Sequence, residues 1–414
     1  MYVMEWSRRY WCQQVPERGP FQWMAAGVLV TTAGEGAWYT TWAIYFTTIA
    51  GLSAAAVGIG LLIAGAIGLA AVTPVSALAD RIGPRNLLAV LVAINGASMA
   101  TFIVVRSFWL FVLVAAINTT ADRAGAGVQT TYVAGLSSPA TRITQLGRQR
   151  VAAHVGYTIG AAGGAICLSI DTTAAFTMLI GVNAVTSLVY AALLTQMPTV
   201  PAPTRTTTVT SSSVVHDSAF LAVIASTGAL SLCWGLISTG LPLWLIRDTR
   251  LPPAALVGVV IIINSLGIAV FQVTASRGCN TARGASVRAV WSGAALAVAC
   301  LLLASTRHAG GFLAAGVVIV AALTHLAGEL WFIAAKWGLT LDLTPEGRTG
   351  QYQGAAATAE AAALMISPAI MTGLIGSWGQ PGWFVLAALF AVSGLTAVPT
   401  SRWALRTRPS PDLA

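Results

Sequence analysis

Twelve apolar runs, each long enough to cross a lipid bilayer, dominate the sequence. Each run has about 20 residues or more, the length that a membrane-spanning helix requires. Hydrophobic residues make up 56% of the 414-residue chain and charged residues only 8%, whereas soluble domains carry about 25% charged residues. We therefore predict an all-α, polytopic membrane protein with twelve transmembrane helices, at residues 21–48, 54–78, 86–105, 108–136, 150–170, 173–196, 218–246, 254–275, 286–305, 311–337, 352–376 and 382–401.

The longest break between these runs divides them into two groups of six. Its sequence, PTVPAPTRTTTVTSSSVVHDS, is rich in Pro, Thr and Ser, which is typical of a flexible linker. A weak repeat relates the two groups, because SAAAVGI at 53–59 aligns with PAALVGV at 253–259. We expect two pseudo-symmetric six-helix halves. The predicted segments are an N-terminal tail at 1–20, an N-terminal half at 21–196, the linker at 197–217, a C-terminal half at 218–401 and a C-terminal tail at 402–414.

Positive charge is distributed unevenly between the two sides of the predicted membrane. If the N-terminus is cytoplasmic, 17 of the 22 Lys and Arg residues fall in inner segments, four in outer segments and one, Arg123, within a helix. This is the bias that the positive-inside rule describes. We therefore expect a location in the cell inner (plasma) membrane with both termini cytoplasmic. The net charge of +9 then reflects topology, and we expect no nucleic-acid partner.

A charged turn between the second and third predicted helices carries the most specific motif. The stretch SALADRIGPR places Asp80, Arg81, Gly83 and Arg85 on the inner side. A generic positive-inside turn would need only the arginines, but the order resembles the G-x-L-A-D-R-x-G-R-R signature of the major facilitator superfamily. The resemblance implies a twelve-helix transporter in which Asp80 and the arginines form a conformational latch between the halves. Ser76 replaces the first Gly of the signature, and we expect it to loosen helix packing there.

The fourth predicted helix contains two adjacent charges in the stretch DRAGAG. Charges at membrane depth are costly and usually functional. Arg123 with Gly127 resembles the family pattern R-x-x-x-G, whose Arg is linked to proton coupling; a structural ion pair is the alternative. Because adjacent residues point about 100° apart on a helix, we expect Asp122 and Arg123 each to find a partner on another helix or in water.

The fifth predicted helix contains a strip of small residues, Gly156, Gly160 and Gly164, within GYTIGAAGG. Small residues at this spacing allow close contact between helices. The string also resembles the antiporter signature G-x-x-x-G-P-x-x-G, which is associated with exporters. Ala161 replaces the Pro of that signature, so the direction of transport stays open.

Further acids lie in the tenth and eleventh predicted helices. His325 and Glu329 are four residues apart and share a helix face. They are candidates for handling protons or contacting substrate, whereas a metal site would need a third ligand. The following stretch resembles the tenth-to-eleventh helix region of the bacterial drug:proton antiporter branch and places Glu360 within a helix; a packing contact to a hydroxyl is the alternative for Glu360. Trp234 and Trp331 are candidate substrate contacts.

The five cysteines show no metal-like spacing, and we expect no metal and no cofactor.

The first predicted helix carries a carboxylate, Glu35, near its middle. An ionised acid at this depth costs at least about 2.5–3.5 kcal/mol. Trp38, Tyr39 and Trp42 share its helix face, and a packing stripe or interface belt is the alternative. A carboxylate with aromatic faces suits a lipophilic cation, and a buried carboxyl readily takes up a proton because burial disfavours its charged form. We therefore expect Glu35 to be neutralised alternately by a proton and by substrate.

These observations favour a secondary transporter that works by alternating access. The preferred hypothesis is proton-coupled export of a small amphipathic compound, cations included, such as a drug, antibiotic or secondary metabolite. A proton-coupled symporter that imports a small metabolite is the alternative. The sequence shows no catalytic constellation, so we expect no enzyme. The expected partners are a small-molecule substrate, protons and the lipid bilayer, and we expect a monomer.

Overall fold

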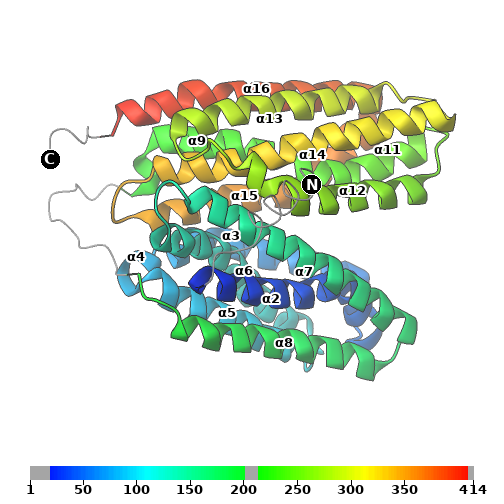
Figure 1. Ribbon diagram of the computed structural model, residues 1–414. Helices are drawn as coiled ribbons and strands as arrows, with labels where there is room; N and C mark the ends of the chain where they lie inside the picture. The colour runs from blue at the N-terminus through cyan, green and yellow to red at the C-terminus, as the bar shows by residue number, and fades with distance from the viewer. Residues whose placement is uncertain (1–18, 201–212, 409–414) are drawn as a thin grey trace, which may run out of the picture. The chain divides into compact units, whose positions relative to one another are not determined.

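A computed structural model describes residues 19–200 and 213–408, and all regular secondary structure in these ranges is helical (Figure 1). Ten helical segments in this part of the chain are long and apolar enough to cross a membrane. The helices α2 (Pro20–Ile44) and α6 (Phe108–Leu136) are not among the ten, because threonines and charged residues lower their apolarity. Most of the predicted N-terminal tail, the middle of the linker and the end of the C-terminal tail lie outside the described residues.

The chain divides into two compact units. Unit 1 comprises Met1–Arg205 and Glu346–Thr358, and unit 2 comprises Thr206–Pro345 and Ala359–Ala414. Besides α2 and α6, unit 1 contains η1 (Tyr45–Ile49), α3 (Ala54–Ser76), α4 (Ala79–Ile82), α5 (Pro84–Phe102), α7 (Arg142–Ile170), α8 (Thr173–Gln196) and the first part of α15 (Thr349–Met371).

Unit 2 contains the remaining helices and the second part of α15. They are η2 (Val214–His216), α9 (Ser218–Leu230), α10 (Cys233–Gly235), η3 (Leu236–Gly240), α11 (Leu241–Asp248), α12 (Pro253–Ala275), α13 (Ala282–Ala304), α14 (Gly311–Asp342), η4 (Thr372–Ser377) and α16 (Gln380–Arg406).

The predicted helices agree with the structure in type and order, and the differences lie at their ends and in one interruption. Helix α7 begins at Arg142 and not at 150, and α14 continues to Asp342 and not to 337. The α7 extension begins with polar helix turns, which hydropathy alone does not detect, whereas the α14 extension, GLTLD, includes the buried Leu339 and Leu341. The predicted helix 218–246 is interrupted after Leu230, where α9 ends and α10 and η3 follow. The repeat falls on α3 and α12, which both have 23 residues.

An aromatic cluster forms the core at one end of unit 1. Trp38 stacks on Phe102 with ring centroids 5.5 Å apart, and Phe46 meets Phe111 edge-on at 4.6 Å. These side chains come from α2, η1, α5 and α6 and are all buried. Burial of such large apolar side chains contributes about 1.5–3 kcal/mol each. The cluster therefore fixes the middle of α2, where Glu35 lies, against α5 and α6.

Glycines bring α2 and α7 into close contact. A Cβ atom at Gly160 would lie 1.9 Å from the Ala33 carbonyl oxygen, and one at Gly164 would lie 1.8 Å from Thr40 Oγ1. A Cβ at Gly156 would likewise lie 2.1 Å from Thr32 Oγ1. No larger side chain fits at these positions unless the helices move apart. The glycine strip of α7 therefore packs against α2 and determines how α7 side chains meet the Glu35 region.

Candidate functional site

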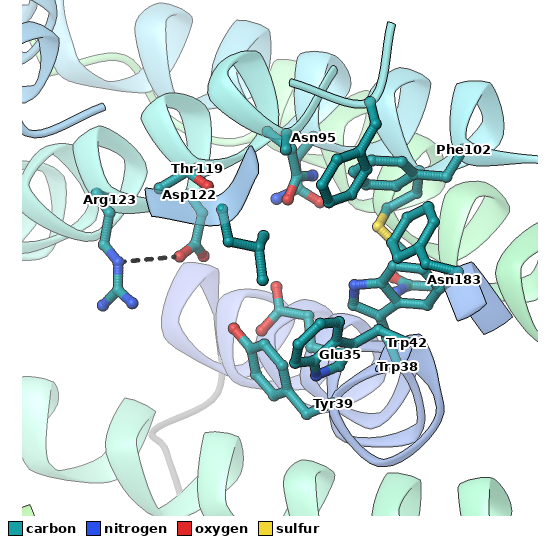
Figure 2. Close-up of a pocket in the computed structure, with 16 residues that line it drawn as sticks. Glu35, Trp38, Tyr39, Trp42, Asn95, Phe102, Thr119, Asp122, Arg123 and Asn183 are labelled. Atoms are coloured by element: carbon teal, nitrogen blue, oxygen red, sulfur yellow. Dashed lines mark ion pairs between the residues drawn. The ribbon is translucent and has the colours of Figure 1, made fainter. Parts of the chain in front are cut away.

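Unit 1 contains a pocket with a volume of about 270 Å³, which four long helices, α2, α5, α6 and α8, line together with η1 and α3. Figure 2 shows Glu35 and Asp122 pointing into it. The side chains around the pocket are acidic, aromatic and carboxamide groups, with a few apolar residues. They are Glu35, Trp38, Tyr39, Trp42, Phe46, Leu61, Asn95, Met99, Phe102, Phe111, Ala115, Asn118, Thr119, Asp122, Arg123 and Asn183.

Glu35 lies in the middle of α2, where it is partly buried. Its Oε2 atom accepts a hydrogen bond of 3.0 Å from the hydroxyl of Tyr157 on α7. Gly36 makes this contact possible, because a Cβ there would lie 2.5 Å from the Tyr157 carbonyl oxygen. A hydrogen bond to the charged form of a carboxylate stabilises that form. Tyr157 is therefore placed to influence when Glu35 holds a proton, and sequence reasoning missed it because a tyrosine in a helix carries no distinctive signal.

Asp122 and Arg123 on α6 also line the pocket. Arg123 Nε lies 3.7 Å from Asp122 Oδ2, so these neighbours contact each other, as the alternative of a structural ion pair predicted (Figure 2). The long arginine side chain bends back and overcomes the angular separation of adjacent helix positions. Both side chains keep about a third of their surface exposed, 39% for Arg123 and 33% for Asp122. At this exposure the pair is only weakly stabilising, so both groups remain able to meet a ligand.

The aromatic stripe of α2 divides into different environments. Trp38 is only 9% exposed and packs mainly against the other side chains of the aromatic cluster. Tyr39 is 53% exposed, and its ring lies 6.0 Å from that of Tyr157. Trp42 is partly buried and lines the pocket. All three side chains border the pocket, but they offer a ligand unequal amounts of surface.

A second acidic cluster lies in unit 2, around Glu329 on α14. Glu329 is 2% exposed and accepts hydrogen bonds from Trp234 Nε1 at 2.9 Å and from Asn264 Nδ2 at 2.7 Å. His325, also 2% exposed, lies one turn away with Nε2 2.9 Å from the carbonyl oxygen of Cys233. The same carbonyl oxygen also accepts from the backbone N–H of Leu236, at the end of α10. The structure thus groups His325, Glu329 and Trp234, and it adds Asn264, which sequence reasoning missed.

Glu360 on α15 forms an ion pair with Lys336 on α14, within unit 2. Lys336 also lies 6.0 Å from the Trp234 ring centroid and 5.9 Å from that of Phe332, which is within reach of cation–π attraction. Sequence reasoning overlooked Lys336 as a site residue. One signal was available, because it is the only lysine in the chain. Trp331 faces another direction and packs edge-on against Trp291 of α13 at 5.6 Å.

Asp80 connects the charged turn between α3 and α5 to the start of α15. Its Oδ1 accepts from the backbone N–H of Gly350 at 2.7 Å and its Oδ2 accepts from that of Gln351 at 2.9 Å. These N–H groups belong to the first helical turn, where a carboxylate also complements the helix dipole. Sequence reasoning could not name these partners, because they lie 270 and 271 residues away along the chain.

The other residues of the turn have separate roles. Arg85 Nη1 donates to the carbonyl oxygens of Thr195 at 3.1 Å and Met197 at 2.8 Å, at the end of α8. Gly83 has φ 86°, a left-handed conformation that favours glycine. Arg81 is exposed.

The expected loosening at Ser76 is wrong. Ser76 is 0% exposed and is packed directly against α15. A glycine at position 76 would leave room for α15 to approach α3. Here that room is left by glycines on α15 instead. A Cβ at Gly354 would lie 2.6 Å from Ser76 Cβ, and one at Gly350 would lie 2.6 Å from the Ser76 carbonyl oxygen. Glycines on α15 therefore compensate for the serine on α3.

Comparison with known proteins addresses the family directly. The family model of the Major Facilitator Superfamily matches residues 24–368, most of the chain. The chain belongs to this superfamily. This membership confirms the family predicted from the SALADRIGPR motif and identifies a multi-pass membrane transporter, not an enzyme. It leaves the drug:proton antiporter branch undecided. No curated protein sequence matches the chain.

Solved structures show the same fold at low sequence identity. The human organic anion transporter MFSD10 (TETRAN) has 17% identity and a TM-score of 0.68, with 92% of this chain and 99% of that chain covered. A bacterial homologue of the iron transporter ferroportin, in an outward-facing state, has 16% identity and a TM-score of 0.70, with 93% and 99% covered. The E. coli fucose:proton symporter has 13% identity and a TM-score of 0.66, with 92% and 98% covered. At these identities the likeness extends to the fold alone.

Proposed function

We propose that this superfamily member is a proton-coupled exporter of a small amphipathic compound, cations included, such as a drug, antibiotic or secondary metabolite. The observation that carries the proposal is Glu35, a membrane-embedded carboxylate in a pocket that aromatic side chains line. A protonated Glu35 is neutral and suits a pocket without ligand. An ionised Glu35 attracts a cationic substrate, and Trp42 adds an aromatic face. Proton and substrate then compete for one carboxylate, which is a direct means of coupling their movements.

Asp122 and Arg123 support this competition. Asp122 adds a second negative charge to the pocket, and Arg123 offsets part of it through the 3.7 Å contact. The guanidinium stays charged at all physiological pH values. We therefore assign Arg123 the role of offsetting one of the two carboxylate charges. One proton then decides whether the net charge of the pocket is negative or zero. Tyr39 and Trp38 complete the proposed substrate contacts in unit 1.

The cluster in unit 2 is proposed as a second proton-handling region. Glu329 is deeply buried and held by two neutral donors, Trp234 and Asn264. His325 lies one turn away, and Glu360 is paired with Lys336. A buried carboxylate among neutral donors can be discharged by a proton without breaking these contacts. Trp234 is the candidate substrate contact here, while Trp331, packed on Trp291, has weaker support.

We propose alternating access of the two sequence halves, 21–196 and 218–401, as the transport cycle. Asp80 would act in the latch by holding the first turn of α15, supported by its two short hydrogen bonds. Arg85 would keep the turn in place through the end of α8, with Gly83 and Arg81 completing the motif. The proposal further includes a monomer in the cell inner membrane with both termini and the linker in the cytoplasm, supported by the distribution of arginines.

The alternative function is proton-coupled import of a small metabolite. Ala161 keeps this alternative open, because the residue replaces the Pro of the exporter signature. Structural neighbours named as proton symporters for fucose and xylose share the fold. The strip Gly156, Gly160 and Gly164 is explained by helix packing alone and gives no independent support to export.

Flux in inside-out vesicles distinguishes the two functions. A panel of toxic amphipathic compounds, tested in a host that lacks its own exporters, first identifies a substrate. With an acidic lumen, export predicts that substrate accumulates in the lumen while protons leave it. Symport predicts that the same gradient drives preloaded substrate out of the lumen together with protons. Accumulation that is insensitive to collapse of the pH gradient would contradict proton coupling in either direction.

A further inference from the structure

The side chain of Asn183 lines the pocket from α8 and is 0% exposed. Neither its amide nitrogen nor its amide oxygen has a hydrogen-bond partner within the part of the chain that the structure describes. Buried polar side chains in proteins are almost always hydrogen-bonded, and those that are not usually have a functional reason. An amide with two donor hydrogens and an acceptor oxygen, buried at the wall of a pocket, is therefore equipped to bind a polar group within it.

The backbone of α2 holds this amide beside the residue that precedes Glu35. A Cβ atom at Gly34 would lie 2.7 Å from Asn183 Oδ1 and 2.8 Å from its Cγ. Glycine at position 34 is thus required for α8 to place the amide there. Any larger residue would displace it. The same short stretch of α2 therefore positions one carboxylate and one unpaired carboxamide at the pocket.

Two more carboxamides complete the polar wall. Asn118 lies on α6 one turn before Asp122, and its Nδ2 atom is buried without a hydrogen-bond partner among the residues that the structure describes. Asn95 extends from α5 into the same pocket (Figure 2). Three helices thus each contribute a group that both donates and accepts hydrogen bonds. A purely apolar cation would leave these groups unpaired on binding, which is energetically costly.

We propose that the ligand of this pocket is a small hydroxylated organic amine, a compound with one protonated nitrogen and at least one hydroxyl group. This inference rests on the proposed function and specifies its substrate class. Glu35 and Asp122 bind the ammonium group, and Asn183 with Asn118 binds the hydroxyl group, which donates and accepts as a carboxamide does. Trp42 contacts the apolar part. A pocket volume of about 270 Å³ limits the compound to one or two rings, since drug-sized pockets begin at about 300 Å³.

Two amines that differ in one hydroxyl group test this proposal on the purified full-length protein. The probes are 2-amino-1-phenylethanol and 2-phenylethylamine, both monocations at pH 7, and calorimetry measures their dissociation constants. The wild type should bind the hydroxylated amine at least tenfold more tightly. Asn183→Leu should reduce this preference to less than threefold, while the affinity for 2-phenylethylamine stays unchanged. Ser187→Ala is the matched control, because Ser187 is a buried polar residue one turn along α8 outside the pocket lining.

Thermal unfolding without ligand separates binding from structure. Removal of an unpaired buried amide should leave the unfolding temperature of Asn183→Leu unchanged or raise it. A fall in stability together with equal loss of affinity for both amines would mean that Asn183 has a structural role, and would overturn the proposal. Absence of binding of both amines to the wild type, or an undiminished preference in Asn183→Leu, would also overturn it.

The outcome is separate from that of the proposed function. Proton-coupled flux of a cation without hydrogen-bonding groups, such as tetraphenylphosphonium, with no preference between the two amines, would keep the proposed function and reject this ligand class. A tenfold preference that depends on Asn183, without any proton-coupled flux, would keep the ligand class and reject the proposed function.

Discussion

Gly160→Ala should separate α7 from α2 and impair transport. The Cβ of the new alanine would lie 1.9 Å from the carbonyl oxygen of Ala33 and 2.8 Å from the amide nitrogen of Ala37. Both are backbone atoms and cannot rotate away. Since carbon and oxygen atoms in contact stay at about 3.4 Å or more, the two helices must separate locally by roughly 1.5 Å. Overpacking of this kind costs about 1–3 kcal/mol, which lowers an unfolding temperature by roughly 2–12 °C.

The functional effect follows from the position of Tyr157, one turn before Gly160 on α7. Its 3.0 Å hydrogen bond to Glu35 would lengthen beyond about 3.5 Å and be lost. Gly163→Ala is the matched control, because a Cβ there meets nothing within 4 Å, while both variants gain the same helix propensity of about 1 kcal/mol.

Thermal unfolding in detergent and proton-driven flux in proteoliposomes are measured for both variants. Equal unfolding temperatures for Gly160→Ala and Gly163→Ala would refute the packing argument. Wild-type flux in a destabilised Gly160→Ala protein would refute the link from packing to the Glu35 site.

Substitutions at three further contacts test other parts of the account. Asp80→Asn should lower transport several-fold at unchanged membrane abundance, because one of the two acceptor oxygens at the start of α15 becomes a donor; normal flux would remove the latch role. Arg123→Ala should abolish coupled flux. Arg123→Lys should restore little of it, since lysine lacks the planar fork of donors. Equal activity of the wild type and Arg123→Lys would show that only the charge of this residue matters. Lys336→Glu and Glu360→Lys should each cost up to about 3 kcal/mol of stability, and the double swap should recover most of it in thermal unfolding; a double variant as unstable as the singles would show that the pair contributes little.

The helices were predictable from the sequence because hydropathy determines which segments can lie in lipid. Their ends were less predictable, because polar turns such as the start of α7 at Arg142 continue a helix without adding apolar residues. The interruption after Leu230 was missed for a related reason. The stretch ALSLCWGL is apolar throughout, so hydropathy does not register a change in its backbone hydrogen bonding.

The charged residues of the site were predictable because they interrupt apolar segments. Glu35 and Asp122 stand out because a carboxylate is rare and costly in an apolar segment. Tyr157, Asn183 and Asn264 do not stand out, since single neutral polar residues are common in membrane helices. Only the packing of α2 against α7 and α8, which glycines allow, shows that Tyr157 and Asn183 belong to the site.

Comparison of Glu35→Gln with the wild type in proteoliposomes tests the central claim most directly. Gln mimics a permanently protonated Glu35, so the protein should fold and insert normally. If Glu35 exchanges a proton for substrate, a pH gradient should drive uphill flux in the wild type and none in Glu35→Gln. Zero-gradient exchange should persist in the variant for a neutral substrate and weaken for a cationic one. Glu346→Gln is the control, because Glu346 is an exposed acid outside the pocket. Wild-type gradient-driven flux in Glu35→Gln would contradict the claim and would leave Asp122, Glu329 or Glu360 as the proton carrier.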